Sequence, residues 1–587
     1  MLGFAKVVAE LNRRKVVQVG LIYLAAAWLM VEVASVILPI FDVSAWVSRL
    51  IVLVLVLGFP VALALAWIFD ITSEGIRRTD PTSIPGKLTI VSAALFMLVG
   101  TAGVYLYVVP DETELGHNVV AVMACDNWTG DSGLEYLSDG LAEDIMNRVS
   151  RLRPIQVIAR GSTFSLKHQN LDIPTIAQKL GAAYVLTCSL RKFGEALRIS
   201  AQLTDAKENK TLWSNNFDRS PDRTIDVLNE ISVAVAEGMS EEVLGEDRAR
   251  LAREGTANPQ ALDLYMRGRF HFNQMTATSH RKAQDYYQQA LQQDSGYARA
   301  YAAIADSLSF SAQFESIPKQ VIRPEMMAAL EKAIELDDGL ADAWAVLGLI
   351  RMEFYDDWAG SIEPLQRAYE INPNNLEANN YLRQYYAVVG PAEKQIQYAE
   401  TAIRIDPLGT FTSAQVMFMY ETLRQYDKAL EASEATLALE PNFALTFQGR
   451  TLIFDALGRY QEALQAIDKG IELRGSDDVL DLQGFRARVL AKLGRIDEAE
   501  ALLRELQNRA KDDYVPPVFF AMIYEGLGRY DVTLDWLEKA YEEEDWILHW
   551  VVRGAMFDSV RDTRRFKAIM QDLGLEEEGY LKTSLSL

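Results

Sequence analysis

The stretch ADAWAVLGLIRMEFYDDWAGSIEPLQRAYEINP, residues 341–373, contains the pattern on which the fold of this chain rests. Its closing pair, Asn372-Pro373, is followed by Asp406-Pro407 and then by Glu440-Pro441, each 34 residues after the pair before it. Proline cannot continue a helix, so each pair predicts the end of one helical unit and the start of the next. Between the pairs, apolar residues recur three or four positions apart, as they do on one face of a helix. The sequence therefore predicts a repeated unit of two helices.

Working outward from this stretch, the same period extends over residues 264–547. We expect eight units, the second stretched by an insertion at residues 311–323. The units begin near Leu264, Ala298, Ala341, Leu376, Thr410, Ala444, Leu480 and Tyr514. A single helical pair cannot bury its own apolar stripe, so the units are expected to stack into a superhelix. An irregular helical bundle is the alternative, and the constant step disfavours it.

A 34-residue unit of two helices resembles the tetratricopeptide repeat (TPR) family. Trp344, Leu347 and Gly348 match the tryptophan, leucine and glycine of that family's first helix, and Ala333 matches the alanine of the second helix. Asp338 stands where the family has proline, so the chain departs from the pattern there. The resemblance implies an all-α solenoid whose concave groove binds protein partners.

The charge of the chain excludes one class of partner. Its 58 lysines and arginines against 81 aspartates and glutamates give a net charge of −23. Nucleic acids are bound by basic faces, so no nucleic-acid partner is expected.

The five histidines are scattered without metal-ligand spacing, and we expect no metal and no cofactor.

The N-terminal region is the most apolar part of the chain. Residues 1–15 predict a basic amphipathic helix, and the apolar runs at residues 16–39, 46–69 and 88–109 each predict a transmembrane helix, giving a membrane domain over residues 16–110. Basic residues flank the first and third runs, which predicts a cytoplasmic N-terminus and places the bulk of the chain in the periplasm of a bacterial inner-membrane protein. Glu32 lies inside the first run. A carboxylate there either contacts a partner helix or takes part in a proton-linked step, or it lies close enough to the outer interface to reach water.

Residues 118–244 change period and predict a small α/β domain, in which short apolar runs alternate with helical segments. A charged linker at residues 245–263 follows, and residues 548–587 predict a C-terminal cap on the repeats. The fold class is therefore multi-domain, with transmembrane helices, a small α/β domain and an all-α TPR solenoid.

The α/β segment resembles the TolB amino-terminal-like domain, which is related to the FlgO fold. The matching segments are residues 120–122, 127–131, 135–141, 157–160, 184–191 and 212–214. The chain departs from the family at Ala124-Cys125, where the family has proline-phenylalanine, and at Cys188, where it has glycine. Some relatives carry a nucleotide cyclase or a DNA-binding domain at the N-terminus, and we expect neither in the short segment before the first apolar run.

Cys125 and Cys188 are the two cysteines of the chain, and both fall on or beside predicted strands of the α/β segment. In such sheets the first and third strands are often neighbours, which would allow a disulfide if the compartment is oxidising. Two buried thiols that never meet are the alternative.

The sequence contains no phosphate-binding loop, metal pair or nucleophile motif. Asp139, Glu143 and Asp144 form an acidic group at the start of a predicted helix, where carboxylates are favoured by the helix dipole, and this explanation is preferred to catalysis. We therefore expect no enzyme activity.

The expected partner-binding surface is the concave face of the repeats. In the TPR register it includes apolar anchors interleaved with acids. The residues are Met352, Glu377, Gln384, Phe411, Phe418, Glu421, Leu445, Leu452, Asp455, Asp481, Val518 and Met522. The alternative is that some of them pack the superhelix itself.

The expected function is a membrane-anchored scaffold or accessory subunit that binds protein partners of an envelope complex. The lipid bilayer is a further expected partner, and the sequence leaves open whether the chain associates with itself. The alternative is a sensor subunit whose TolB-like domain binds a ligand and relays the signal through membrane helices.

Overall fold

The structure is a computed structural model of the 587-residue chain. It describes residues 116–575 apart from 153–154, 194–195, 220–223, 240–254, 316, 476–479 and 546, together with 69–72, 75–78 and eight single positions nearer the N-terminus, namely 19, 23, 26–28, 30, 55 and 58. The chain divides into two compact units, Met1–Glu114 and Leu115–Leu587.

The first unit corrects the expected fold class. Strands β1 (Phe69–Thr72) and β2 (Gly75–Arg78) pair antiparallel as a hairpin, so Phe69, the last residue of the second predicted span, is in a strand. In the part of the chain that the structure describes, no helix is long and apolar enough to cross a bilayer, which requires about 20 apolar residues. The predicted fold class with transmembrane helices is therefore wrong.

The predicted localisation in a bacterial inner membrane, with the bulk of the chain in the periplasm, is corrected with it, because it rested on those three spans. Most of the three runs at residues 16–39, 46–69 and 88–109, and Glu32 among them, lie outside the described residues.

The second unit begins with a mixed sheet. Its strands are β3 (Gly116–Val122), β4 (Asp126–Asn127), β5 (Gln156–Val157), β6 (Ala182–Phe193), β7 (Ala196–Asp205) and β8 (Lys210–Arg219). The order is β5-β3-β6-β7-β8, with β4 pairing β6. The pairs of β3 with β5 and β6 are parallel, whereas β6, β7 and β8 are antiparallel.

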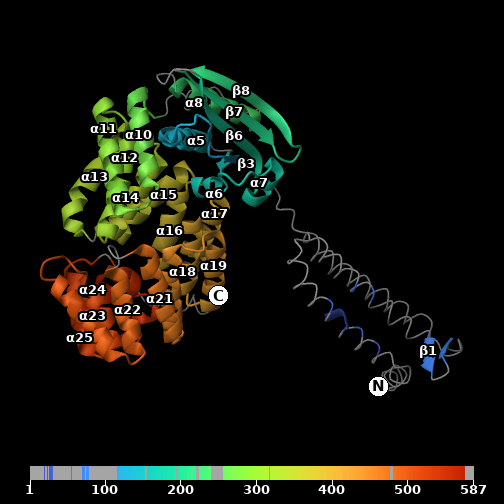
Figure 1. Cartoon of the computed structure of the whole chain (residues 1–587). Helices are drawn as coiled ribbons and strands as arrows, with labels where there is room; N and C mark the ends of the chain where they lie inside the picture. The colour runs from blue at the N-terminus through green and yellow to red at the C-terminus, as the bar shows by residue number, and fades with distance from the viewer. Residues whose placement is uncertain are drawn as a thin grey trace. The chain divides into compact units, whose positions relative to one another are not determined.

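Helices cover both faces of this sheet. Along β3, Val120 and Val122 face a core shared with α5 (Glu135–Ser150) and α8 (Thr224–Met239), while Val119 and Ala121 face α7 (Ile173–Leu180). The alternation follows from the two-residue period of a strand. Figure 1 shows α5 between the sheet and the helical repeats. A short helix, α6 (Arg160–Ser165), follows β5.

The rest of the chain is helical and confirms the prediction of TPR-like repeats. Within the described residues, eight helical pairs follow one another (Figure 1). The pairs are α10 (Pro259–Phe272) with α11 (Ala277–Gln293), α12 (Ala298–Glu315) with α13 (Lys319–Leu336), α14 (Ala341–Phe354) with α15 (Trp358–Ile371), α16 (Leu376–Val388) with α17 (Ala392–Ile405), α18 (Thr410–Thr422) with α19 (Tyr426–Leu439), α20 (Ala444–Ala456) with α21 (Tyr460–Arg474), α22 (Leu480–Lys492) with α23 (Ile496–Arg509), and α24 (Pro517–Gly526) with α25 (Tyr530–Glu542). The first helix begins five residues before the predicted Leu264, because Asn258 caps it and Pro259 starts it.

The turn inside a unit has a recurrent cause. Gly458, Gly494 and Gly528 end the first helix of the last three units with φ of 70°, 80° and 71°. Only glycine adopts this left-handed conformation without cost, so the turn to the second helix is fixed locally.

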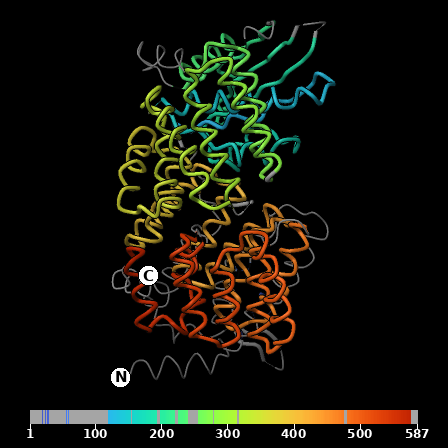
Figure 2. The backbone as a smooth tube through the Cα atoms, turned by 90° about the vertical axis from the view of Figure 1, so that its left-hand side faces the viewer, coloured from blue at the N-terminus to red at the C-terminus, as the bar shows by residue number. Residues whose placement is uncertain are grey.

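The C-terminal segment returns to the middle of the repeats. It consists of α26 (Leu548–Val551), a 3-10 turn η4 (Ala555–Phe557) and α27 (Arg564–Asp572). His549 packs edge-on against Trp358 of the third unit with ring centroids 5.2 Å apart. Arg424, after α18, forms two hydrogen bonds of 2.7 and 2.8 Å to Asp558. The superhelix is therefore closed by its own C-terminal end, seen in red beside the ochre middle units in Figure 2.

Candidate functional site

A cavity of about 2060 Å³ lies on the concave side of the repeats. Its wall is built mainly from the first helix of successive units. On α18, the lining residues Phe411, Gln415, Phe418 and Thr422 recur every three or four positions. One face of each first helix therefore points into the cavity.

Two other parts of the chain complete the wall. Glu143 and Met146 of α5 and Arg160 of α6 line it from the α/β domain, and Trp550 and Met556 line it from the C-terminal segment. Residues outside the helical repeats therefore contribute to the wall of the cavity.

Most of the sequence-predicted binding residues line this cavity. They are Glu377, Gln384, Phe411, Phe418, Glu421, Leu445, Leu452, Asp455 and Asp481. Phe411 is 43% exposed, whereas Gln384, Glu421 and Asp455 are buried. Gln384 donates a hydrogen bond to Glu353, and Asp481 is paired with Arg474 at 2.8 Å.

Met352, Val518 and Met522 lie elsewhere. All three are fully buried in one core cluster that joins the third unit to the eighth unit and the C-terminal segment. These three side chains are therefore part of the hydrophobic core, and they do not line the cavity. In these three cases the structure agrees with the alternative reading of the sequence, in which the residue packs the superhelix itself.

Acidic side chains gather on the wall formed by the second to fourth units. The side chain of Glu377 is exposed to solvent in the cavity. The surrounding protein nevertheless reduces the solvation of its carboxylate, and this desolvation and the charge of Asp342 together raise the pKa of Glu377 to about 8. Burial raises the pKa of Asp306 to about 7 and that of Glu353 to about 7. This wall thus changes its charge near neutral pH.

A second acidic pair lies on the fifth and sixth units. Glu421 on α18 and Asp455 on α20 are 8% and 9% exposed, and both line the cavity. Burial and then the charge of Asp455 raise the pKa of Glu421 to about 7, although Arg424 acts in the opposite sense. The two carboxyl groups are close enough for the charge of one to disfavour that of the other.

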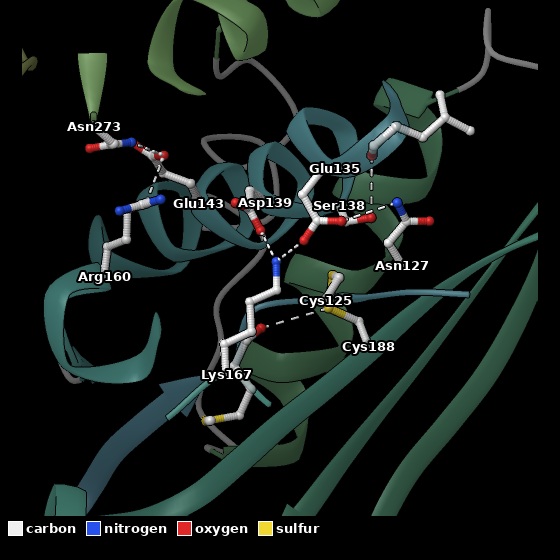
Figure 3. Close-up of polar contacts among 12 residues, drawn as sticks. Cys125, Asn127, Glu135, Ser138, Asp139, Glu143, Arg160, Lys167, Cys188 and Asn273 are labelled. Carbon is white, nitrogen blue, oxygen red and sulfur yellow. Dashed lines mark hydrogen bonds and ion pairs between the residues drawn. A yellow bond between two sulfur atoms is a disulfide. The ribbon is translucent and has the colours of Figure 1, made fainter. Parts of the chain in front are cut away.

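The acidic residues of α5 have partners that the sequence did not reveal (Figure 3). Glu143 accepts hydrogen bonds from Arg269 Nε at 2.6 Å and from Asn273 Nδ2 at 3.3 Å, both on or next to α10, and lies 3.5 Å from Arg160 Nε. Burial alone would raise the pKa of Glu143, but Arg269 and Arg160 outweigh it and hold the pKa below its usual value. Asp139 is paired with Lys167 at 2.6 Å.

These pairs fix the α/β domain against the repeats. Asp144 on α5 accepts from Arg148 at 2.5 Å and from Arg299 of α12 at 2.7 Å. At the far end, the backbone N–H and the hydroxyl of Ser162 both donate to Asp406 Oδ1, at 2.8 and 2.6 Å. Glu143 and Asp144 of α5 are therefore engaged in holding the two domains together.

Cys125 and Cys188 form a disulfide with their Cα atoms 4.6 Å apart (Figure 3). Cys125 follows β3 and Cys188 lies on β6, which are neighbouring parallel strands. The bridge lies inside the core between the sheet and α5.

Within the described parts of the chain, no group of three or more His, Cys, Asp and Glu side chains is arranged to hold a metal ion.

Sequence reasoning missed the wall residues that come from outside the repeats. Arg160 and Glu143 belong to the α/β domain, and Trp550 belongs to the segment expected only to cap the repeats. Arg383, on α16, was also missed, and its guanidinium donates to Gln415 of α18 at 2.7 Å. Arg383 directly precedes Gln384, a residue of the predicted concave register, whereas only the folded chain brings the other three to the cavity.

Comparison with known proteins gives no matching family model. The chain is similar to putative adenylate cyclase 3 of Rhizobium meliloti (strain 1021), with 31% identity over 186 residues, which are 32% of this chain and 32% of the relative. The chain therefore spans about a third of the length of that curated relative.

Three solved structures are similar in part. YrrB, a TPR protein with an unusual peptide-binding site, is 18% identical with a TM-score of 0.23, over 32% of this chain and 92% of YrrB. Yeast Tom70 is 14% identical with a TM-score of 0.34, over 60% of this chain and 82% of Tom70. PilF of Pseudomonas aeruginosa is 15% identical with a TM-score of 0.29, over 41% of this chain and 98% of PilF.

Proposed function

We propose that this protein is a non-enzymatic scaffold that holds a segment of a protein partner in the cavity of its helical repeats. The observation that carries the proposal is the cavity itself, lined by rings and carboxyl groups from the first helices of successive units. Buried rings are typical anchors of protein interfaces, and carboxylates add selectivity for basic or neutral segments.

The size of the cavity favours a peptide over a small molecule. Its volume of about 2060 Å³ is larger than the roughly 300–1,000 Å³ of typical small-molecule sites. The lining residues come from eight successive first helices, α10 to α24, which suits an extended segment.

The test uses two rings of the cavity wall. The partner is identified by purification of the tagged full-length chain and mass spectrometry, and its retention is then compared between variants. We expect Phe411→Asp and Phe418→Asp each to reduce retention at least about tenfold, because an aspartate in an apolar anchor position costs more than about 1.4 kcal/mol.

The control is Val321→Asp, which changes an apolar side chain that is 70% exposed and does not line the cavity. Retention of the partner at wild-type level by both phenylalanine variants, with unchanged thermal unfolding, would show that the cavity is not the binding site.

We further propose that the α/β domain is of the TolB amino-terminal-like type and serves as a fixed wall of the scaffold. The matched segment Asn127 to Asp131 supports this, because it forms one compact turn in which Asn127 Oδ1 accepts from the backbone N–H of Thr129 at 3.1 Å. The matched segment Leu212 to Ser214 lies in β8.

A second function, ligand sensing by the α/β domain, is supported by one observation. Helix α5 packs under the sheet and is ion-paired through Glu143 and Asp144 to Arg269 and Arg299 of the repeats. A ligand that displaces α5 would therefore disturb the cavity wall. Amide hydrogen exchange of α10 and α12 that changes when a ligand is added would support sensing, and unchanged exchange would oppose it.

A further inference from the structure

The cavity contains one repeated combination of an apolar and an acidic side chain. Phe418 and Glu421 on α18 are one helical turn apart, as are Leu452 and Asp455 on α20, 34 residues further on. Residues three apart share a helix face, and all four line the cavity. Adjacent units thus present two apolar groups and two carboxyl groups side by side.

Glu421 is buried without a counter-charge bonded to it. It is 8% exposed, and among the residues that the structure describes no hydrogen bond reaches its carboxyl group. The nearby Arg424 directs both terminal nitrogens to Asp558. A buried carboxylate normally has a bonded partner, because leaving it unpaired is costly.

Asp455 offers a second free acceptor. Its Oδ2 accepts from Arg488 Nε at 3.1 Å, while its Oδ1 is buried with no partner in the described structure. One carboxyl oxygen of Asp455 therefore lacks a bonded partner in the described structure.

The chain itself shows how this position holds a guanidinium group. Arg488 of α22 is ion-paired to both Asp455 of α20 and Glu525 of α24. Phe485 lies one helical turn before Arg488 on α22. A guanidinium between two carboxylates with an apolar neighbour is thus an arrangement that these repeats already use.

Space is left over Glu421 by a glycine. A Cβ atom on Gly554 would lie 3.6 Å from Glu421 Oε1, in van der Waals contact with the carboxyl group. Gly554 has a φ of −63°, so its presence is not required by the backbone.

We infer that Glu421 and Asp455 form a subsite for an arginine side chain of the bound segment, with its aliphatic stem against Phe418 and Leu452. Arginine suits the site because its planar group donates to two carboxylates at once. The inference rests on the proposed function, since it specifies the chemistry of the segment that the cavity binds.

The test uses full-length protein and two pools of acetylated and amidated octapeptides that are randomised except for one central residue. That residue is arginine in one pool and citrulline, its uncharged isostere, in the other. We expect wild-type protein to retain the arginine pool at least about tenfold better, the ratio that corresponds to about 1.4 kcal/mol for a charge-assisted contact.

Three variants probe the subsite. Glu421→Gln and Asp455→Asn should bring the ratio between the pools close to one, and Gly554→Leu should do so without changing any charge. Glu434→Gln is the matched control, because it removes an acid that is 73% exposed from the same repeat unit and should leave the ratio unchanged.

Asp455→Asn also weakens the pair with Arg488, so each variant is first checked for cooperative thermal unfolding, and the other two still test the inference if this one does not fold. The inference is overturned if wild-type protein does not distinguish the pools, or if Glu421→Gln keeps the wild-type preference.

Failure of the proposed function has a different signature. Phe411→Asp should reduce retention of both pools together, because it removes an anchor shared by all segments. If both pools bind and Phe411→Asp leaves their retention unchanged, binding occurs outside the cavity and the proposed function fails.

Discussion

At the scale of single residues, the buried carboxyl groups of this protein are of two kinds, which differ in whether a positively charged side chain is bonded to them. Glu143 and Asp144 are neutralised by arginines of another domain and serve the structure. Glu421 is equally buried but has no such partner bonded to it. Burial is therefore common to both kinds, and the presence of a counter-charge distinguishes them.

The pKa of Glu421 leads to a pH-dependent prediction. Because its pKa is about 7 in the folded protein, above the usual carboxyl value, the folded state keeps the proton to higher pH than the unfolded chain. Stability is therefore lost as pH rises from the usual carboxyl range to about 7. Glu421→Gln removes this loss, so the variant should be more stable than wild type at pH 8, by on the order of 2 kcal/mol, and nearly equal to it at pH 5.

The measurement is the thermal midpoint of both proteins over this pH range. Glu434→Gln, an exposed carboxyl on α19, should give a difference from wild type that does not depend on pH in this way. A constant difference between Glu421→Gln and wild type from pH 5 to 8 would contradict the prediction.

At the scale of helices, close approach within a unit decides the packing. Gly348 on α14 faces α15 so closely that a Cβ atom would lie 2.4 Å from Leu365 Cγ and 3.3 Å from the carbonyl oxygen of Ser361. The small residue that the repeat pattern requires at this place is therefore explained by contact with the second helix of the same unit.

Gly348→Ala should destabilise the protein. The added methyl group overpacks the α14–α15 contact, at a cost of roughly 1–3 kcal/mol that exceeds the gain in helix propensity. The matched control is Gly470→Ala on α21, where the nearest atom to the new Cβ is 3.6 Å away. That variant should be as stable as wild type or slightly more so, because alanine favours a helix by about 1 kcal/mol over glycine. The comparison is made by denaturant unfolding, and equal effects of the two substitutions would contradict this account.

At the scale of the whole second unit, the repeats are closed from two sides. The α/β domain reaches from α10 to the loop before α18, where Ser162 meets Asp406 and the backbone N–H of Ala159 donates to the carbonyl of Ile405 at 2.8 Å. The C-terminal segment closes the other side through Asp558 and His549. The cavity thus depends on contacts between parts far apart in the sequence.

Asp406→Asn should loosen one of these contacts locally. Asp406 is 5% exposed and accepts from Ser162 and from Thr412 Oγ1, the latter at 2.7 Å, so an amide nitrogen in place of either oxygen would face a donor. We expect amide hydrogen exchange in α6 to become at least about tenfold faster, in line with the loss of about 1.5–3 kcal/mol for a charged hydrogen bond.

Exchange in β6 and β7 should stay unchanged in this variant, because the sheet has its own core. The control is Asp468→Asn, an exposed acid paired with Arg486 within the repeats. Unchanged exchange in α6 of Asp406→Asn would show that the docking contact does not depend on this carboxylate.

Local pattern was enough to predict the helical pairs. The proline that follows Asn372, Asp406 and Glu440 and the recurrent apolar spacing act over a few residues, so they can be read without knowing the rest of the fold. The concave register of Phe411, Phe418 and Glu421 follows from the same spacing. Apolar content alone, by contrast, misled the reading of the N-terminal region, where Phe69 pairs in a hairpin.

The sequence by itself determined the repeating helices and the face of each that points inward, because both depend on periods of a few residues. Only the tertiary structure decided which inward residues stay accessible. Met352 and Val518 share the register of the cavity but are buried in a core cluster that also contains residues of the C-terminal segment. Glu143 reaches the cavity from another domain, 126 residues away from the Arg269 that neutralises it. Such contacts depend on the curvature accumulated over eight units, and no local pattern encodes that sum.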